Sequence, residues 1–231
     1  MKIFARLSWA YATFMIFASM ALMIIIFPIF RSPRSQKISA WIIRTLLFIP
    51  IRVKGEENPD AQMFLLNHQS DIDIGILETI TKRNLAWVAK KELFDVPFYG
   101  LLLKLPNDIA VERESKTSLI KLIKDVKSRL DDGRVITMFP EGTRSSNGRM
   151  LPFKPGAKMV ADKYRLLVQP IVIIEAAAYY NIKKYHYRPG QLTAIYMDAF
   201  EADKRDKEWL TELRVKMQKV YDDELRVSTR S

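Results

Sequence analysis

Two polar stretches of this chain contain residue types that can move a proton and hold an anion. The first, NHQSDID at residues 67–73, places His68 five positions before Asp73. The second, FPEGTRS at residues 139–145, combines a carboxylate, a glycine, a hydroxyl and a guanidinium. An imidazole accepts a proton near neutral pH, and a neighbouring carboxylate can orient it. A guanidinium binds phosphate through paired hydrogen bonds.

The spacing of His68 and Asp73 decides whether they can act together. Within one helix they would point about 140° apart and could not touch. If His68 lies in a loop and a helix begins near Ser70 or Asp71, Asp73 lies in its first turn and can face the loop. The carboxylate would then orient one imidazole nitrogen and leave the other free as a base for a substrate hydroxyl or water. The alternative is that His68 only ends a strand and Asp73 only caps a helix.

The second stretch offers three groups suited to an anion. Gly142 lets a backbone N–H approach an oxyanion, Thr143 can donate from its hydroxyl, and Arg144 can bind phosphate. The same three residue types also occur in an ordinary polar turn.

The elements that must position these stretches alternate along the chain. Expected strands are 62–66, 85–89, 108–111, 134–139, 167–174 and 191–197. Expected helices are 71–81, 98–105, 115–131, 156–164 and 206–225. This alternation predicts an α/β fold, a largely parallel sheet flanked by helices. Ligands of such sheets bind beyond the carboxyl ends of the strands, which is where both polar stretches lie.

The N-terminal region is apolar enough to enter a membrane. Between Arg6 and Arg31 lie 24 residues without a charge, about 36 Å as a helix, against a hydrocarbon core of about 30 Å. A shorter apolar segment, residues 38–53, follows and contains Arg44. One span with an interfacial helix and a hairpin of two shallow helices both fit this pattern. Its length disfavours a cleaved signal peptide, and its lack of charge disfavours a buried core helix.

A polar cluster, KGEENPD at residues 54–60, follows the apolar segments. It predicts a membrane-associated helical segment at residues 1–53 and an α/β domain at residues 54–231. Basic residues flank the first apolar segment on both sides, so their distribution gives no orientation.

The amino-acid composition limits the classes of molecule that this chain is expected to bind. The chain has 37 Lys and Arg against 26 Asp and Glu, a net charge of +11, which suggests an anionic partner. The apolar N-terminal region favours a lipid bilayer over nucleic acid. The absence of cysteine excludes disulfides, thiolate zinc sites and a cysteine nucleophile, and no cluster of metal-ligating residues is evident.

Together these stretches resemble the glycerolipid acyltransferase family, most closely its bacterial 1-acyl-sn-glycerol-3-phosphate (lysophosphatidate) acyltransferases. NHQSDID is similar to the family's motif of a histidine, four residues and an aspartate, and FPEGTRS to its glycerophosphate motif. Two further blocks follow in the family's order, AKKELFDVPFYGLLLKL at 89–105 and VQPIVI at 168–173. The resemblance covers roughly residues 50–200.

The resemblance implies a role for each matching residue. His68 would be the general base for a lysophospholipid hydroxyl, and Asp73 would orient it. The residues implied in substrate binding are Glu141, Gly142, Thr143 and Arg144 for the glycerol phosphate, Arg113 for the phosphate, and Lys90 for the developing oxyanion. No metal or cofactor is implied, and the co-substrate would be acyl-CoA or acyl carrier protein.

The implied activity is transfer of a fatty acyl group to the sn-2 hydroxyl of lysophosphatidate, giving phosphatidate. The implied location is the bacterial inner (cytoplasmic) membrane, with the active site on the cytoplasmic side. Glycerol 3-phosphate or another lysophospholipid is the alternative acceptor. An alternative of another class is a non-catalytic anionic-lipid-binding protein on the same fold.

Overall fold

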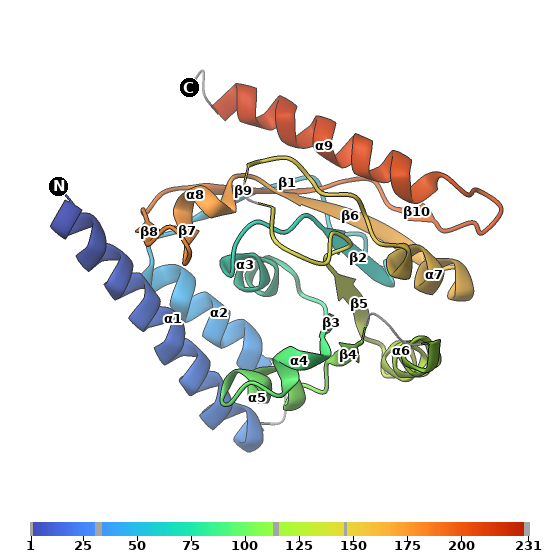
Figure 1. Cartoon of the computed structure of the whole chain (residues 1–231), viewed down its shortest axis with the longest axis horizontal. Helices are drawn as coiled ribbons and strands as arrows, with labels where there is room; N and C mark the ends of the chain where they lie inside the picture. The colour runs from blue at the N-terminus through green and yellow to red at the C-terminus, as the bar shows by residue number, and fades with distance from the viewer. Residues whose placement is uncertain (1, 31–33, 113–115, 146, 229–231) are drawn as a thin grey trace.

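The computed structural model describes residues 2–30, 34–112, 116–145 and 147–228, and a mostly parallel sheet with flanking helices forms its centre (Figure 1). The strands are β1 (Ile51–Lys54), β2 (Met63–Leu66), β3 (Leu85–Lys90), β4 (Ile109–Val111), β5 (Val135–Met138), β6 (Leu167–Ile173), β7 (Tyr180–Asn181), β8 (His186–Tyr187), β9 (Leu192–Tyr196) and β10 (Phe200–Glu201). The helices are α1 (Lys2–Phe30), α2 (Arg34–Leu46), α3 (Ile72–Ile80), α4 (Lys91–Phe94), α5 (Tyr99–Lys104), α6 (Lys116–Asp131), α7 (Pro155–Tyr164), α8 (Ala176–Tyr179) and α9 (Trp209–Ser228). The predicted α/β fold is confirmed.

The order of the strands determines which loops can meet. In the main sheet the order is β1-β9-β6-β2-β5-β3-β4, and β10 pairs with β6. The run β6-β2-β5-β3-β4 is parallel, whereas β9 and β10 are antiparallel to β6. Strands β2 and β5 are buried throughout, as the continuous apolar runs of a parallel sheet require. Because β2 and β5 are parallel neighbours, the loops that follow them leave the sheet at the same edge.

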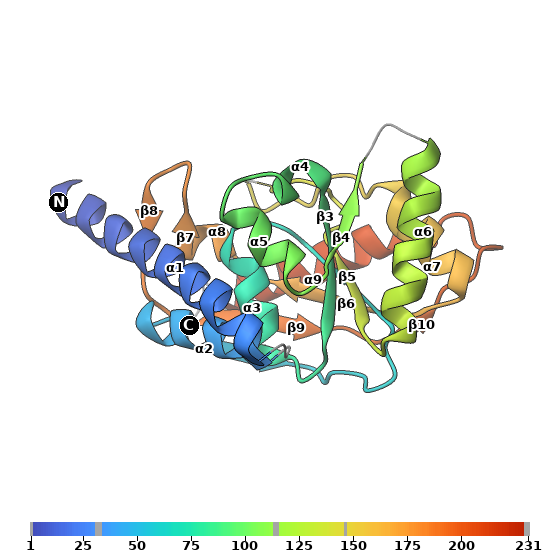
Figure 2. The same cartoon turned by 90° about the horizontal axis from the view of Figure 1, so that it is seen from below.

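Each face of the sheet has its own hydrophobic core. One core joins the sheet to α6, α7 and α9, with Val126, Val160 and Met217 fully buried. The other joins it to α1, α2 and α3, with Ala12 and Leu77 fully buried. Figures 1 and 2 show α9 on one side of the sheet and α1, α2 and α3 on the other.

The structure corrects the prediction for residues 38–53. Only their first part is helical, in α2, and β1 follows and pairs in parallel with β9. Gly55 then turns the chain with φ +70°, where a Cβ atom would lie 2.2 Å from the carbonyl oxygen of Tyr196. The predicted boundary after residue 53 falls within β1, and the division into two domains stays a prediction.

Besides β1, five short elements were not predicted from the sequence: α4, α8, β7, β8 and β10. Each contains four residues or fewer, too few to show a period of side-chain polarity. The hairpin of β7 and β8 nevertheless matters, because it packs against α1.

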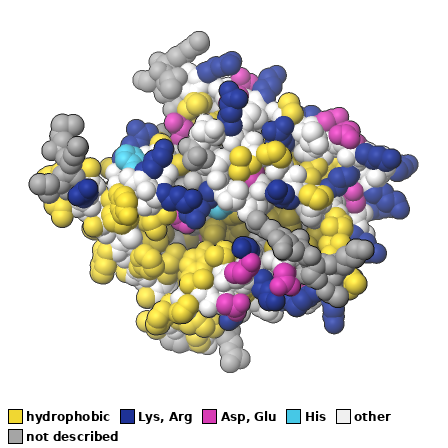
Figure 3. Space-filling view, viewed as in Figure 1, with side chains coloured by type: hydrophobic (Ala, Val, Ile, Leu, Met, Phe, Trp, Pro, Cys, Tyr) yellow, Lys and Arg dark blue, Asp and Glu magenta, His cyan; other side chains and the backbone are white. Residues whose placement is uncertain are grey.

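The N-terminal helices pack on the protein with one face and expose apolar side chains on the other. The buried face of α1 consists of Ala12, Ile16, Ser19 and Met23, spaced by one helical turn. Its exposed apolar residues include Phe4, Leu7, Phe14, Phe17 and Ile25. Figure 3 shows hydrophobic side chains gathered at the lower left, where Figure 1 places α1 and α2. By length and composition, residues Phe4–Pro28 could cross a membrane.

A buried ion pair supports the strands beside the sheet's β4 edge. Asp108 Oδ1 lies 3.1 Å from Arg134 Nη2 and accepts the backbone N–H of Trp87 at 3.0 Å. The guanidinium of Arg134 also donates to the backbone carbonyl oxygens of Leu85, Pro106 and Asn107. Burial raises the pKa of Asp108 to about 7, although Arg134 acts in the opposite direction.

Replacing Arg134 should destabilise the fold in a pH-dependent way. Arg134→Met leaves Asp108 buried without its cation, and we expect a loss of about 3 kcal/mol in unfolding free energy at pH 7. In the wild type, the raised pKa of Asp108 means that stability falls as pH rises towards 7. Without Arg134 that pKa rises further, so the variant alone keeps losing stability above pH 7, by about 1 kcal/mol per pH unit.

Chemical denaturation of both proteins in detergent at pH 7 and pH 9 measures this difference. Lys127→Met, which breaks an exposed ion pair with Asp131, is the control and should change stability by less than about 0.5 kcal/mol. A pH-independent loss in Arg134→Met would contradict the assignment.

Candidate active site

The loops that follow β2 and β5 are joined into one unit by hydrogen bonds. The N–H of Ser145 donates to the carbonyl oxygen of His68 at 2.8 Å. The N–H of His68 in turn donates to Glu141 Oε1 at 2.8 Å, and Glu141 Oε2 accepts the N–H of Leu151 at 2.7 Å. The position of His68 is therefore fixed by its own loop and by the loop after β5.

His68 and Asp73 are in contact, as their spacing predicts. Nδ1 of His68 lies 2.8 Å from Oδ2 of Asp73, a fully buried residue in the first turn of α3. The same oxygen accepts the backbone N–H groups of Gln69 and Ser70 at 2.7 and 2.8 Å. Because a carboxylate oxygen accepts, Nδ1 carries the proton, and Nε2 of the neutral imidazole keeps its lone pair.

Two aromatic rings complete the support of the imidazole. The His68 ring stacks on Phe139, with centroids 3.9 Å apart and planes 13° apart. Phe139 lies in turn 5.3 Å from the ring of Trp87, at 28°. The His68 side chain is left 17% exposed. Sequence analysis missed both contacts, and the available signal was an aromatic residue at the start of the second polar stretch.

Amide side chains anchor the first loop to distant elements. Asn67 exchanges two hydrogen bonds of 2.8 Å with the backbone of Ile173, at the end of β6. Gln69 donates to the hydroxyl of Tyr221, on α9, at 3.1 Å. The loop that carries His68 is thus tied to both the sheet and the last helix.

The second loop presents polar groups to solvent beside the first. Gly142 has φ +70°, which favours glycine, and its N–H donates to the carbonyl oxygen of Phe139 at 3.0 Å. Thr143 is exposed. Arg144 is 37% exposed and forms an ion pair with Asp71, at the start of α3. Arg144 therefore lies at the mouth of the first loop with much of its guanidinium accessible.

A cavity of about 50 Å³ opens between the two loops and the turn of the β7–β8 hairpin. Its lining includes Arg144 and Lys183, which are cationic, and the polar residues Gln69 and Ser145. Within the described part of the chain, Gln69 Oε1 and Ser145 Oγ are buried without a hydrogen-bond partner. The lining also contains the carboxylate of Asp71, which pairs with Arg144, so the two cations leave the cavity with a net positive charge that suits an anionic group.

Glu141 differs from its predicted role in holding the glycerol phosphate. It is 1% exposed, and both of its carboxylate oxygens accept backbone N–H groups, so it braces the loops instead of facing a phosphate. Burial also raises the pKa of its carboxyl group. Lys90, the predicted oxyanion contact, ends β3 and lies 2.8 Å from Glu92. Arg113 lies outside the described residues.

In the ranges that the structure describes, the site contains an imidazole with a free nitrogen but no metal centre. No three His, Cys, Asp or Glu side chains of those ranges gather where they could hold an ion. The expectation that the chemistry needs neither metal nor cofactor stays a prediction.

Comparison with known proteins gives a consistent set of relatives. A family model described as Acyltransferase matches residues 35–174. A Helicobacter pylori protein named 1-acyl-sn-glycerol-3-phosphate acyltransferase is 35% identical over 189 residues, 81% of this chain and 80% of that protein. A Cocos nucifera protein of the same name is 29% identical over 187 residues, 79% of this chain but only 61% of that protein.

Among solved structures, the fold matches a 1-acyl-sn-glycerophosphate acyltransferase from Thermotoga maritima. The TM-score is 0.75, with 22% sequence identity, over 100% of this chain and 98% of that one. At this identity the match establishes the shared fold, including the region of α1 and α2.

Proposed function

The chain belongs to the acyltransferase family, and on this premise we propose that it acylates the sn-2 hydroxyl of lysophosphatidate to form phosphatidate. The observation that carries the proposal is the His68 imidazole, held at Nδ1 by Asp73, in a loop whose next residues line a cavity together with Arg144 and Lys183. The names of the relatives support the choice of acceptor. The acyl donor is a thioester, either acyl-CoA or acyl carrier protein.

The proposed reaction uses His68 as both base and acid. Nε2 takes the proton from the acceptor hydroxyl as the oxygen attacks the thioester carbonyl carbon. Collapse of the tetrahedral intermediate breaks the C–S bond, and the departing sulfur takes the proton back from the imidazolium. Asp73 stabilises the imidazolium through the Nδ1 hydrogen bond. The products are an ester and a free thiol, so atoms and charge balance.

The acceptor's phosphate is proposed to lie in the cavity between the loops. Arg144 supplies a partly exposed guanidinium there, and Lys183 adds a second positive charge. Thr143 is proposed to donate from its exposed hydroxyl. Glu141 is proposed to position His68 through their hydrogen bond, and Lys90 remains a candidate for stabilising the oxyanion.

We also propose that α1 and α2 lie in one leaflet of a bacterial inner membrane, on the cytoplasmic side. Both halves of α1 are attached to the α/β part of the chain or to α2. Near its start Trp9 packs on Tyr185 of the β7–β8 turn, with ring centroids 4.8 Å apart. In its second half the carbonyl oxygen of Ser19 accepts the Ser39 hydroxyl of α2 at 2.8 Å.

A membrane-crossing α1 would therefore draw other elements into hydrocarbon. The β7–β8 turn carries the exposed Lys183 and Lys184, and each charge at the bilayer centre costs about 3 kcal/mol or more. Lying parallel to the surface, α1 instead buries its exposed apolar face in lipid and leaves these lysines at the anionic headgroups. The acceptor, a membrane lipid, then meets the candidate site without leaving the bilayer surface.

Substitution of His68 should abolish acyl transfer while leaving membrane association intact. His68→Ala removes the base, and we expect kcat to fall about 100- to 10,000-fold. Thiol release with acyl-CoA or acyl carrier protein and a panel of lysolipids, with products identified by mass spectrometry, measures this loss and the acceptor preference.

His186→Ala, which changes the only other histidine, is the matched control and should keep wild-type activity. Retention of most activity in His68→Ala would remove His68 from the mechanism. Wild-type binding to anionic lipid without any thiol release would favour the non-catalytic alternative.

Substitution of Arg144 should weaken binding of the phosphate-bearing acceptor. Arg144→Ala removes a charged hydrogen-bonding group, so we expect the KM for lysophosphatidate to rise about 10- to 100-fold. Steady-state kinetics with each substrate varied in turn make the measurement. Arg149→Ala, an exposed arginine of the same loop, should change that KM less than about twofold. An effect confined to the acyl donor would show that this loop binds the other substrate.

The proposed membrane topology places both ends of the chain on one side. Because the chain contains no cysteine, single cysteines can replace Lys2 and Lys219 without other changes. A membrane-impermeant maleimide should label both variants from the same face of inner-membrane vesicles, and detergent should leave that pattern unchanged. Labelling of the two positions from opposite faces would show that α1 crosses the bilayer.

A further inference from the structure

Glu78 is a buried carboxylate that the proposed reaction does not use. It is 5% exposed and lies on α3, the helix whose first turn holds Asp73. Burial raises the pKa of its carboxyl group, and the nearby Lys37 acts in the opposite direction. A buried carboxylate is costly unless it is hydrogen-bonded or paired, so its partners indicate what it does.

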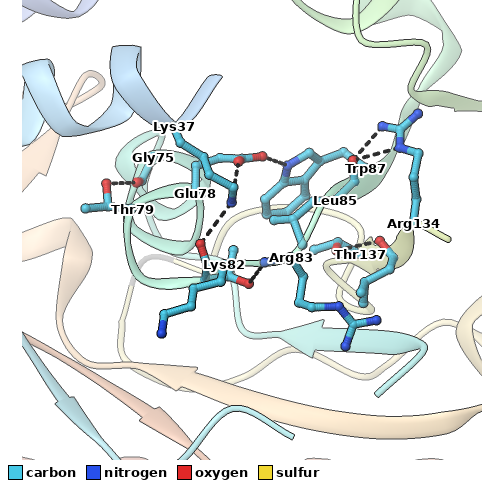
Figure 4. Close-up of polar contacts among 12 residues, drawn as sticks. Lys37, Gly75, Glu78, Thr79, Lys82, Arg83, Leu85, Trp87, Arg134 and Thr137 are labelled. Carbon is cyan, nitrogen blue, oxygen red and sulfur yellow. Dashed lines mark hydrogen bonds and ion pairs between the residues drawn. The ribbon is translucent and has the colours of Figure 1, made fainter. Parts of the chain in front are cut away.

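The two oxygens of Glu78 have different partners, which Figure 4 shows on either side of it. Oε1 accepts the indole N–H of Trp87 at 2.9 Å. Oε2 lies 3.7 Å from the ammonium of Lys37, a residue of α2. The same ammonium donates to the carbonyl oxygen of Thr81 at 2.9 Å. Glu78 thus connects a strand of the sheet with an N-terminal helix.

Trp87 is held at both its side chain and its backbone. Its N–H groups donate to Glu78 from the indole and to Asp108 from the main chain, and the residue is 4% exposed. Its ring lies against Phe139, which stacks on His68. The orientation of the indole therefore determines the surface on which the Phe139 ring, and then the imidazole, can rest.

We propose that Glu78 is a positioning residue for His68, acting through the indole of Trp87 and the ring of Phe139. The inference rests on the proposed role of His68 as the base. The hydrogen bond to Asp73 holds only the Nδ1 edge of the imidazole and gives its faces no support. Stacking on Phe139 fixes the plane of the ring and so the direction of Nε2.

This arrangement also connects the membrane-associated helices with the base. Lys37 reaches Glu78 from α2, and α2 packs on both α1 and α3. A shift of α2 relative to α3 would move the cation that balances Glu78. Through Glu78, the position of α2 can thus influence the stack of Trp87, Phe139 and His68.

Removing the indole should slow catalysis without weakening substrate binding. For Trp87→Leu we expect kcat to fall about 10- to 100-fold, because a misdirected base costs that much, with both KM values changed less than about threefold. Trp209→Leu is the matched control. Trp209 is also buried, and its indole N–H also donates to a carboxylate, Asp162, at 2.9 Å. Equal kcat losses per folded protein in both variants would overturn the proposal.

A second pair of variants keeps the test valid if Trp87→Leu does not fold. Glu78→Met and Glu78→Gln have side chains of similar length, but only glutamine offers an oxygen to the indole N–H. We expect Glu78→Met to show the loss in kcat, and Glu78→Gln to recover most of it. Identical kcat values for the two variants would show that the hydrogen bond does not position the base.

Nuclear magnetic resonance gives a readout that does not depend on activity. The chain has two histidines, so selective labelling yields one imidazole signal set for His68 and one for the exposed His186. Stacking on Phe139 should shift the His68 ring protons upfield through the ring current. Glu78→Met should reduce this shift and leave His186 unchanged.

An unchanged His68 spectrum in Glu78→Met would overturn the positioning role even if the enzyme were active. Conversely, a wild-type protein without acyltransferase activity would contradict the proposed function, while the spectra would still report whether Glu78 positions the imidazole.

Discussion

Three hydrogen bonds that converge on one carboxylate oxygen hold the candidate site in shape. Oδ2 of Asp73 accepts them from the His68 imidazole and from the backbone of Gln69 and Ser70, and the residue is fully buried. A buried carboxylate without partners costs several kcal/mol, so this convergence strongly favours one conformation of the loop. The same contacts that stabilise the fold around Asp73 also fix the proton on Nδ1 of the histidine.

The order of the sheet brings the second loop to this point. Because β2 and β5 are parallel neighbours, the loops after them can exchange hydrogen bonds, and Glu141 bridges them by accepting the N–H of His68. A buried glutamate thus serves as a brace, which leaves Arg144 and the polar lining of the cavity to meet an anion. Within the proposed function, the hydrogen bonds of Ser145 and Glu141 to the His68 backbone hold the loop of the base beside the loop of Arg144.

Helix α3 lies between the candidate site and the N-terminal helices that expose an apolar surface. Its first turn carries Asp73, and its later part carries Glu78, which pairs with Lys37 of α2. Helix α1, whose other face is apolar and exposed, packs on α2, and α2 packs on α3. In the proposed function this arrangement brings a lipid acceptor to a base that is already oriented, because the lipid-facing and catalytic elements share one core.

The sequence by itself determined the α/β class, most strand and helix positions and the contact of His68 with Asp73. Each of these depends on local order: the polarity period of a segment, or a loop–helix junction only five residues long. Residue order did not reveal that Glu141 accepts backbone N–H groups or that Trp87 lies between Glu78 and Phe139, the ring on which His68 stacks. Those contacts depend on the strand order β2-β5-β3 and on α2 packing against α3, which only long-range burial of the two cores decides.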